Sequence, residues 1–191
     1  MDKKYELIAE KAIEVFGRKL FKIRALVDIE SIDVKTGDEG GYIEAEKNLS
    51  HYGNAWVDGD ARVCGNARVY GNAWVYGDAR VYGNAWVYGD ARVYGNARVY
   101  GNARVYGNAR VDGKYKIMTI SNMGSVQHTT TFFVCEDGKI RVRCGCFYGD
   151  LEAFRNKVRE THTDTKHAKA YLAAADFVEA TLDTAVEVSD E

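Results

Sequence analysis

The spacing of apolar and polar residues changes twice along the chain and divides it into three parts. Residues 3–16 place apolar side chains at helical spacing, and Gly17 follows where a helix C-terminus favours glycine, so we expect a helix there. Residues 19–29 have the pattern of a strand. A pattern of period six fills residues 53–112 and then stops. The sequence therefore predicts an N-terminal cap over residues 1–52, a repeat region over 53–112 and a C-terminal module over 113–191.

The repeat region consists of ten contiguous hexads of the form Gly-Asn/Asp-Ala-Arg/Trp-Val-x, in which x is Tyr seven times. Val and Ala alternate with polar or aromatic residues, which is typical of a strand with Val and Ala inward. Gly followed by Asn or Asp supplies a corner, because these residues tolerate a positive φ. Three hexads would close a triangular coil of 18 residues. Residues 1–52 would cap its open end, because an exposed sheet edge needs cover.

The motif Val-Tyr-Gly-Asn-Ala-Arg-Val resembles the hexapeptide repeat of left-handed parallel β-helix proteins. The whole chain is similar to uncharacterised hexapeptide-repeat proteins of bacteriophages and enteric bacteria. The segments that carry this likeness are 22–26, 40–44 and 48–50 before the repeat, and the runs TTTFF and CGCF after it. The resemblance implies a mainly β protein: a left-handed parallel β-helix of triangular coils with an N-terminal α/β cap and a small C-terminal ββαα module. It implies no particular activity.

The C-terminal module has strand patterns at residues 114–121, 129–135 and 140–146, followed by two helical patterns. Asp137 and Gly138 form a predicted two-residue hairpin turn between the last two strands. Asp150 is the expected N-cap of the first helix. The second helix is expected from about residue 164 to 182. The residues expected to face inward from the helices are Leu151, Phe154, Val158, Ala168, Tyr171, Leu172, Ala175 and Val178.

Composition excludes several classes of protein. The net charge of −2 excludes a polycation, so any contact with nucleic acid needs a local basic face. A hydrophobic content of 46% excludes wholesale disorder. No apolar run has the length of a membrane span, and residues 1–10 do not resemble a signal peptide. Together with four unevenly spaced Cys, these features predict a cytoplasmic protein with free thiols and no membrane contact, in the host cytoplasm if a phage encodes it.

Catalysis and metal binding are both disfavoured by the sequence. Hexapeptide β-helices are often acyltransferases, which need a His on the coil, but residues 53–112 contain none and His51 lies at the edge. A zinc site would have to use Cys135, Cys144, Cys146 and His128. The predicted hairpin separates Cys135 from Cys144 by about 13 Å, which zinc–sulfur bonds cannot span. We expect buried thiols on the face of Phe133, Ile140 and Val142, no catalytic residue, no metal and no cofactor.

The outer surface of the coil carries the candidate binding residues, because residues 18 apart stack in columns about 4.8 Å apart. We expect the Arg column to be offset by Asp60 and Asp78. Such ladders can simply stabilise identical coils, but a rigid Tyr/Trp/Arg surface also has the composition of interface hot spots. The fourth hexad positions form the columns Trp56–Trp74–Arg92–Arg110, Arg62–Arg80–Arg98 and Arg68–Trp86–Arg104, and Tyr70 and Tyr88 belong to a neighbouring Tyr column.

The function that these patterns favour is a non-enzymatic protein-binding module. Its expected partner is a bacterial protein or complex, such as a host defence complex that a phage protein would inhibit. Flat aromatic sides also predict self-association as a dimer or trimer. A second contact surface is expected on Arg141, Arg143, Thr129, Thr130 and Thr131. Two alternatives stay open: a nucleic-acid or nucleotide binder that uses the Arg columns, and a hexapeptide acyltransferase.

Overall fold

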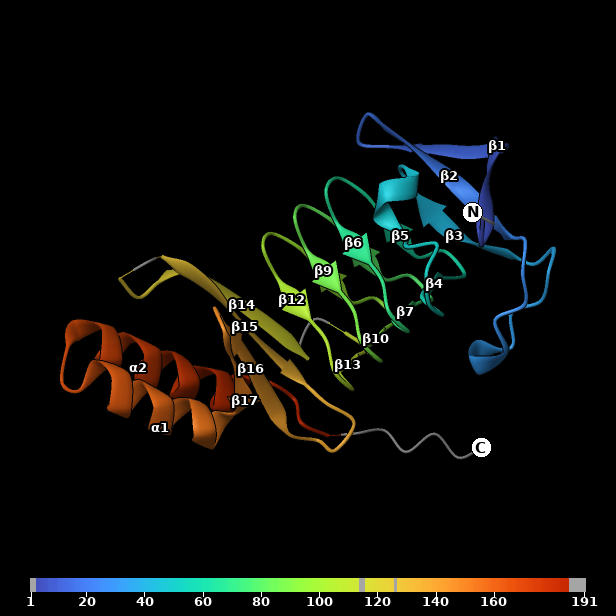
Figure 1. Ribbon diagram of the computed structural model, residues 1–191. Helices are drawn as coiled ribbons and strands as arrows, with labels where there is room; N and C mark the ends of the chain where they lie inside the picture. Colours follow the sequence, from blue (N-terminus) through green and yellow to red (C-terminus); the bar gives the residue numbers. More distant parts are fainter. Residues whose placement is uncertain (1–2, 114–115, 126, 186–191) are drawn as a thin grey trace.

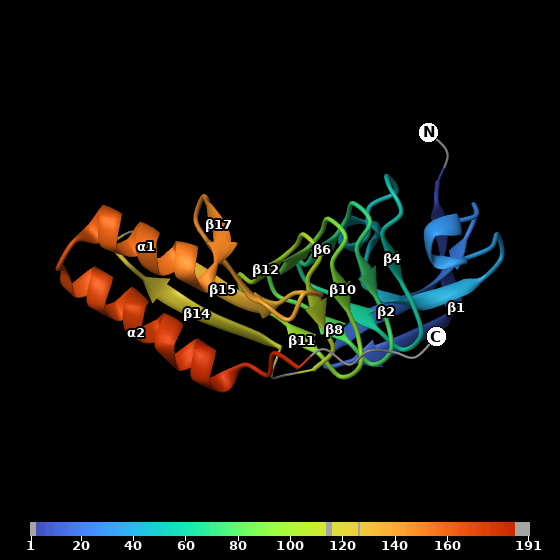
Figure 2. The same ribbon diagram turned by 90° about the horizontal axis from the view of Figure 1, so that it is seen from below.

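A computed structural model describes residues 3–113, 116–125 and 127–185. The three parts follow one another in space as they do in the sequence, with the coil in the middle (Figures 1 and 2). An N-terminal sheet covers one end of the coil, and a sheet with two helices covers the other. No helix in the described ranges is long and apolar enough to cross a membrane.

The repeat forms a parallel β-solenoid, as predicted. Each hexad contributes a two-residue strand, and each strand pairs in parallel with the one 18 residues later, as in Arg62 with Arg80. The strands make three sides, β4-β7-β10-β13, β6-β9-β12 and a third that contains β5-β8-β11. The left hand of the coil stays a prediction. The strands are β4 (Trp56–Val57), β5 (Arg62–Val63), β6 (Arg68–Val69), β7 (Trp74–Val75), β8 (Arg80–Val81), β9 (Trp86–Val87), β10 (Arg92–Val93), β11 (Arg98–Val99), β12 (Arg104–Val105) and β13 (Arg110–Val111).

The inside of the coil holds the Ala and Val of every hexad, and all of them are buried. The corners need glycine for two reasons, which Gly71 illustrates. Its φ is 72°, and a Cβ there would lie 3.0 Å from the backbone nitrogen of Gly89 in the next coil. Outside the corner, Asn66, Asn84 and Asn102 form a hydrogen-bonded amide ladder. The hexad therefore fixes both the turn and the spacing between coils.

The N-terminal segment is a β-hairpin, and the predicted helix over residues 3–16 is wrong. Strand β1 (Tyr5–Val15) pairs antiparallel with β2 (Arg18–Ala25), and the ladder is irregular between Ile8 and Ile13. This irregularity shifts the apolar residues out of strict alternation, so that their spacing imitates a helix. Gly17 is not a helix terminus but the second residue of the hairpin turn, where it and Phe16 have positive φ values of 72° and 50°.

The hairpin continues directly into the coil. Strand β3 (Glu39–Ile43) pairs antiparallel with β2 and parallel with β5, so one six-stranded sheet runs from β1 to β11. Two short 3-10 helices, Glu30–Ile32 and Glu46–Asn48, lie in the connections. The Nζ of Lys4 donates to the carbonyls of Gly53 and Ala55, at 3.1 and 2.6 Å. The N-terminal segment thus covers the first coil and satisfies carbonyls at its exposed edge.

The C-terminal module is the predicted small β and two-helix unit, with more strands than the sequence indicated. Its sheet has the order β14-β15-β16-β17, and Lys114 and Tyr115 of the predicted first strand lie outside the described residues. Asp150 caps α1 as predicted, because its Oδ1 accepts from the Ala153 amide at 2.8 Å. Thr165 caps α2. The elements are β14 (Ile117–Met123), β15 (His128–Val134), β16 (Ile140–Cys144), β17 (Phe147–Asp150), α1 (Leu151–His162) and α2 (Lys166–Thr181).

The two faces of this sheet have different partners. Phe132 and Val142 pack with the helices, whereas Phe133 and Cys135 join the buried cluster of the coil and close its second end. The β15–β16 register is one residue away from the prediction, with Thr130 opposite Cys144. Cys135 pairs with Lys139 around the turn, which leaves a three-residue loop that ends at Gly138. Cys135 therefore lies on the opposite face of the sheet from Ile140 and Val142. The prediction that Cys135 shares a face with these two residues is wrong.

Candidate functional site

The surface columns have the register that the sequence predicts, and in the Trp86 column (Arg68, Trp86 and Arg104) one indole contacts two arginines and a tyrosine. The guanidinium of Arg104 lies 4.2 Å from the centre of the Trp86 ring, and that of Arg68 lies 5.7 Å away. Tyr70 meets the same ring edge-on at 5.9 Å. The indole is therefore enclosed between two cations, each contact contributing about 0.5–1 kcal/mol at a half-exposed site.

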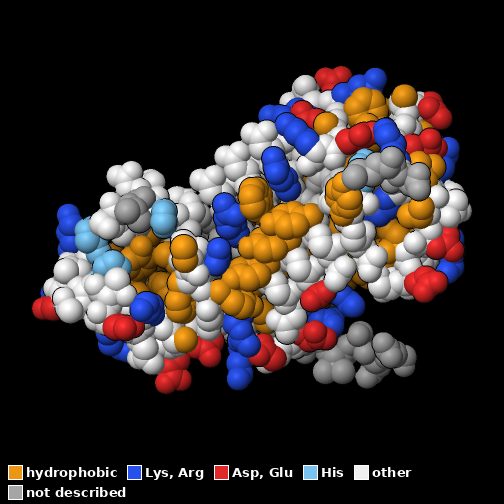
Figure 3. All heavy atoms as spheres, viewed as in Figure 1, with side chains coloured by type: hydrophobic (Ala, Val, Ile, Leu, Met, Phe, Trp, Pro, Cys, Tyr) orange, Lys and Arg blue, Asp and Glu red, His pale blue; other side chains and the backbone are white. Residues whose placement is uncertain are grey.

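A stack of tyrosines borders this column. Tyr70, Tyr88 and Tyr106 lie nearly parallel, with ring centres 4.8 Å apart at each step. Burial is the main cause that raises the pKa of Tyr70, and it raises that of Tyr106 to about 12. In the space-filling view of Figure 3, hydrophobic side chains form a band across the coil, bordered by Lys and Arg. Tyr70 and Tyr106 are therefore neutral at physiological pH, and the stack presents an apolar surface flanked by positive charge.

The column ends in a cleft between the coil and the C-terminal module. The backbone amide of Arg104 donates to Oγ1 of Thr131 at 3.1 Å and fixes β12 against β15. We call the resulting cavity, of about 600 Å³, the junction cleft. The sequence predicted two separate contact surfaces, and the structure brings members of both together here. The cleft is lined by Asn84, Trp86, Asn102 and Arg104 from the coil and by Gln127, His128, Thr129, Thr131, Arg143 and Gly145 from the module.

The junction cleft is positively charged. Its lining contains no Asp or Glu, and in the described part of the chain neither Arg104 nor Arg143 has a carboxylate partner. The guanidinium of Arg143 lies 5.4 Å from the Tyr106 ring, and its Nη1 donates to the Cys146 carbonyl at 3.3 Å. Its Nε is buried without a hydrogen-bond partner. The cleft can therefore accept acidic or hydrogen-bond-accepting groups.

Three predicted site residues, Trp56, Thr130 and Thr131, are buried, and a fourth, Arg141, lies outside the junction cleft. Trp56 is 0% exposed, because the N-terminal cap covers it and Tyr5 meets its ring edge-on at 6.4 Å. Thr130 points into the module, where its hydroxyl contacts the Cys144 sulfur at 3.1 Å. Arg141 pairs with Asp137 at 2.7 Å, outside the junction cleft. The exposed positions that we expected for Trp56, Thr130 and Thr131 are wrong, whereas the contact surface expected at Arg141 stays a prediction.

The other two columns differ in their charge partners. The rings of Trp74 and Tyr76 pack against each other in a tilted arrangement with centres 4.1 Å apart, Trp74 faces Arg92 at 6.0 Å, and Arg110 pairs with Glu136. By contrast, Asp60 and Asp78 make no ion pair with the Arg column within the described ranges, although we expected them to offset it. This all-Arg column, Arg62–Arg80–Arg98, therefore keeps unpaired positive charge on the third side of the coil.

The candidate reactive groups are dispersed. Cys135 is buried as expected, which raises the pKa of its thiol to about 11. Cys144 is half-buried and Cys146 is exposed, so the buried thiols that we expected at these two positions are wrong. His51 stacks on Tyr5 at 4.3 Å, and its Nδ1 accepts from the Lys4 amide. Among the residues that the structure describes, no three His, Cys, Asp or Glu side chains are grouped to hold a metal ion.

The coil has a recognisable counterpart among protein families. Residues 61–77, 73–89 and 91–104 match the family model described as the YdcK beta solenoid repeat. A comparison with curated proteins gives no significant match. The matched residues lie within the coil and include Trp86 and Arg104, whereas the C-terminal module is outside them. The likeness thus agrees with the repeat architecture of the coil.

Proposed function

We propose that this β-solenoid protein is a non-enzymatic binding protein whose partner is another protein. Its contact surface is the binding face, which we define as the Trp86 column, the Tyr70–Tyr88–Tyr106 stack and the junction cleft. The observation that carries the proposal is that coil and module contribute to one continuous surface through the Arg104–Thr131 contact.

The composition of the binding face supports a protein partner. Trp, Tyr and Arg are the residues that most often dominate the free energy of protein association, especially near the centre of an interface. Trp86 lies in the middle of the proposed binding face, between the two arginines of its column and beside the Tyr stack. Arg143 of the module adds a third arginine beside an aromatic ring, because its guanidinium lies against Tyr106. A complementary partner would present apolar side chains to the rings and acidic groups to the cleft.

Rigidity also supports binding. Each coil is tied to the next by backbone hydrogen bonds, such as Trp86 N to Ala103 O at 2.9 Å and Tyr88 N to Val105 O at 3.0 Å. The module is fixed by Thr131 and by the packing of Phe133 into the coil end. A surface that is already ordered loses little conformational entropy when it binds, which favours affinity.

The non-enzymatic part of the proposal rests on the placement of the candidate bases. The coil sequence contains no His, and His51 is engaged by Lys4 and Tyr5 inside the cap. An acyltransferase would need a base on an accessible coil surface. The resemblance to phage proteins directs the search to the bacterial cytoplasm and to host proteins there, including defence complexes.

The test is capture of partners from a nuclease-treated bacterial lysate, with wild-type protein and two matched variants. Trp86→Ala removes the centre of the binding face, and Trp74→Ala removes the same residue type from another side of the coil. We expect one protein to be retained by wild type and Trp74→Ala and lost with Trp86→Ala. Equal capture by all three would contradict the proposed surface.

A second candidate function, nucleic-acid binding, is favoured by one observation, the unpaired charge on the all-Arg column. Each arginine that contacts a phosphate would release about one counterion and add about one unit to the salt slope of binding. Retention on single-stranded DNA that falls steeply with salt, and that weakens similarly with Arg62→Gln, Arg80→Gln and Arg98→Gln, would support this alternative. Salt-independent binding to a protein would count against it.

A further inference from the structure

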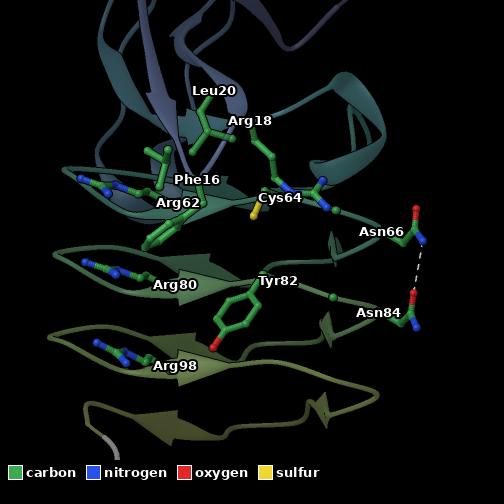
Figure 4. Close-up of a pocket in the computed structure, with 13 residues that line it drawn as sticks. Phe16, Arg18, Leu20, Arg62, Cys64, Asn66, Arg80, Tyr82, Asn84 and Arg98 are labelled. Carbon is green, nitrogen blue, oxygen red and sulfur yellow. Dashed lines mark hydrogen bonds between the residues drawn. The ribbon is translucent and has the colours of Figure 1, made fainter.

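A groove lies on the all-Arg side of the coil, below the tip of the N-terminal hairpin (Figure 4). It has a volume of about 590 Å³. Val15, Phe16 and Leu20 of the hairpin form one wall, and the all-Arg column with Cys64 and Tyr82 forms the floor. We call it the hairpin groove. It lies on another side of the coil from the junction cleft, with which it shares the corner residue Asn84, and the proposed protein-binding function does not use it.

The floor of the hairpin groove contains a gap in an aromatic stack. Cys64, Tyr82 and Tyr100 occupy equivalent hexad positions, and Tyr82 stacks on Tyr100 with ring centres 5.3 Å apart. In the coil before Tyr82 the equivalent position holds Cys64. The stack of Tyr70, Tyr88 and Tyr106, by contrast, has a tyrosine in all three coils. One face of the Tyr82 ring is therefore free of a stacking tyrosine, and the space is one aromatic ring thick because successive coils lie about 4.8 Å apart.

The wall contains an aromatic residue that the fold does not need. Phe16 is 94% exposed, and its φ of 50° is unfavourable for a bulky side chain. Asn is the residue that a two-residue turn of this kind prefers at its first position. In Figure 4 Phe16 projects from the hairpin tip into the groove, on the side of the all-Arg column. Neither the turn conformation nor burial therefore accounts for a bulky aromatic side chain at this position.

The charge of the groove is positive. Its lining contains no carboxylate, and Arg62, Arg80 and Arg98 have no ion-pair partner in the described residues. The neighbouring carboxylate of Glu44 is already neutralised, because it pairs with Arg18 at 2.9 Å and accepts from the Gly65 amide at 2.6 Å. The groove thus joins an open ring face to a row of three unpaired guanidiniums.

We propose that the hairpin groove binds a nucleoside phosphate. The base stacks on Tyr82 in the space left by Cys64, with Phe16 at its edge, and the phosphates contact Arg62, Arg80 and Arg98. The Arg and Tyr positions are two residues apart along each strand, about 7 Å, which suits the separation of a base from its phosphates. The ligand can be a free nucleotide or the end of a single strand, since both present the same group.

The test measures binding by calorimetry, with four probes: adenosine triphosphate, adenosine, inorganic tripolyphosphate and a short oligothymidylate. We expect adenosine and tripolyphosphate each to bind at least about tenfold more weakly than the probe that joins base and phosphate. Tight binding of the triphosphate identifies a free nucleotide as the source, and tight binding of the oligothymidylate alone identifies a strand. Tripolyphosphate that binds as tightly as either would overturn the proposal, because the ring space would then contribute nothing.

Two variants separate the groove from the fold. Cys64→Tyr should complete the stack with the protein's own ring, weaken binding at least about tenfold and leave the melting temperature equal or higher. Phe16→Asn relieves the turn and should also weaken binding without lowering the melting temperature. Undiminished binding by both variants would overturn the proposal.

Matched controls distinguish this proposal from the functions above. Arg80→Gln should weaken nucleotide binding, and Arg68→Gln, at the same hexad position on another side of the coil, should not. Trp86→Ala should leave nucleotide binding unchanged even where it abolishes protein capture. Equal losses with Arg68→Gln and Arg80→Gln would mean unspecific attraction to a basic coil and would overturn the groove as the site.

Discussion

The backbone amide of Arg104 donates a hydrogen bond to Oγ1 of Thr131 at 3.1 Å, across the junction between the coil and the C-terminal module. Thr131 is almost fully buried. Thr131→Val keeps the shape of the side chain but leaves the amide without this partner. We expect the free energy of unfolding to fall by about 1–3 kcal/mol in urea denaturation. Thr129→Val, which lies on the same strand and is less buried, should change it much less. Equal effects would contradict the role of this contact.

The interior of the coil tolerates no charge. Val81 is 0% exposed and is surrounded by Ala and Val of adjacent coils. Val81→Asp should therefore abolish the folded coil, because a buried carboxylate would have no partner. Arg80→Asp, one residue earlier and pointing outward, should keep the β-type circular dichroism spectrum. A folded Val81→Asp protein would contradict the inward orientation of the Val side chains.

The repeat also predicts that whole coils are interchangeable. Deletion of residues 71–88 removes 18 residues and should leave a folded, shorter protein with unchanged corner geometry. Deletion of residues 71–76 should instead rotate the C-terminal module by about one side of the triangle, roughly 120°. Cooperative thermal melting of the first variant checks the prediction. A first variant that fails to fold would show that the coils are not equivalent.

The sequence predicts the coil well because every hexad has the same pattern of residues: a glycine at the corner, Ala and Val facing inward, and an Arg or Trp facing outward. The columns and Tyr stacks follow from that period alone. The N-terminal hairpin was missed because its irregular ladder imitates helical spacing. The burial of Trp56 could not be found, because it depends on Tyr5, which lies 51 positions earlier in the sequence. The junction cleft likewise depends on how the C-terminal module packs against the coil. Local sequence patterns do not predict that packing.

Lys4 makes stability depend on pH. Its burial lowers the pKa of the ammonium group from 10.5 to about 8. Below pH 8 the group is charged in both states, whereas between about pH 8 and 10 only the folded protein releases the proton, so stability rises with pH. The free energy of unfolding should increase on the order of 1 kcal/mol between pH 7.5 and 9.5.

Ionisation of Tyr5 sets the upper pH limit of this measurement, and a Lys4→Met variant is its control. Burial raises the pKa of Tyr5, so above about pH 10 ionisation of this residue in the unfolded state opposes the Lys4 effect. Lys4→Met should flatten the profile below that limit. A wild-type profile that falls between pH 7.5 and 9.5, or one that Lys4→Met does not change, would contradict the assignment to Lys4.

The flat aromatic sides of the coil predict self-association. Tyr100 is 54% exposed and Tyr76 and Tyr94 stack at 4.9 Å, so apolar surface remains available away from the binding face. Light scattering at micromolar concentration should give a mass of a dimer or trimer. A species of 21.3 kDa, the mass of one chain, would count against this prediction.

The most direct test of the account is the affinity of a captured protein partner for two variants of the coil. Trp86→Ala should weaken binding by about 2 kcal/mol or more, roughly thirtyfold, with the fold intact. The triple change of Arg62, Arg80 and Arg98 to Ala should alter that affinity by less than about threefold, because these residues lie on another side of the coil. The opposite pattern, with binding lost in the triple variant and kept by Trp86→Ala, would contradict the proposed binding face.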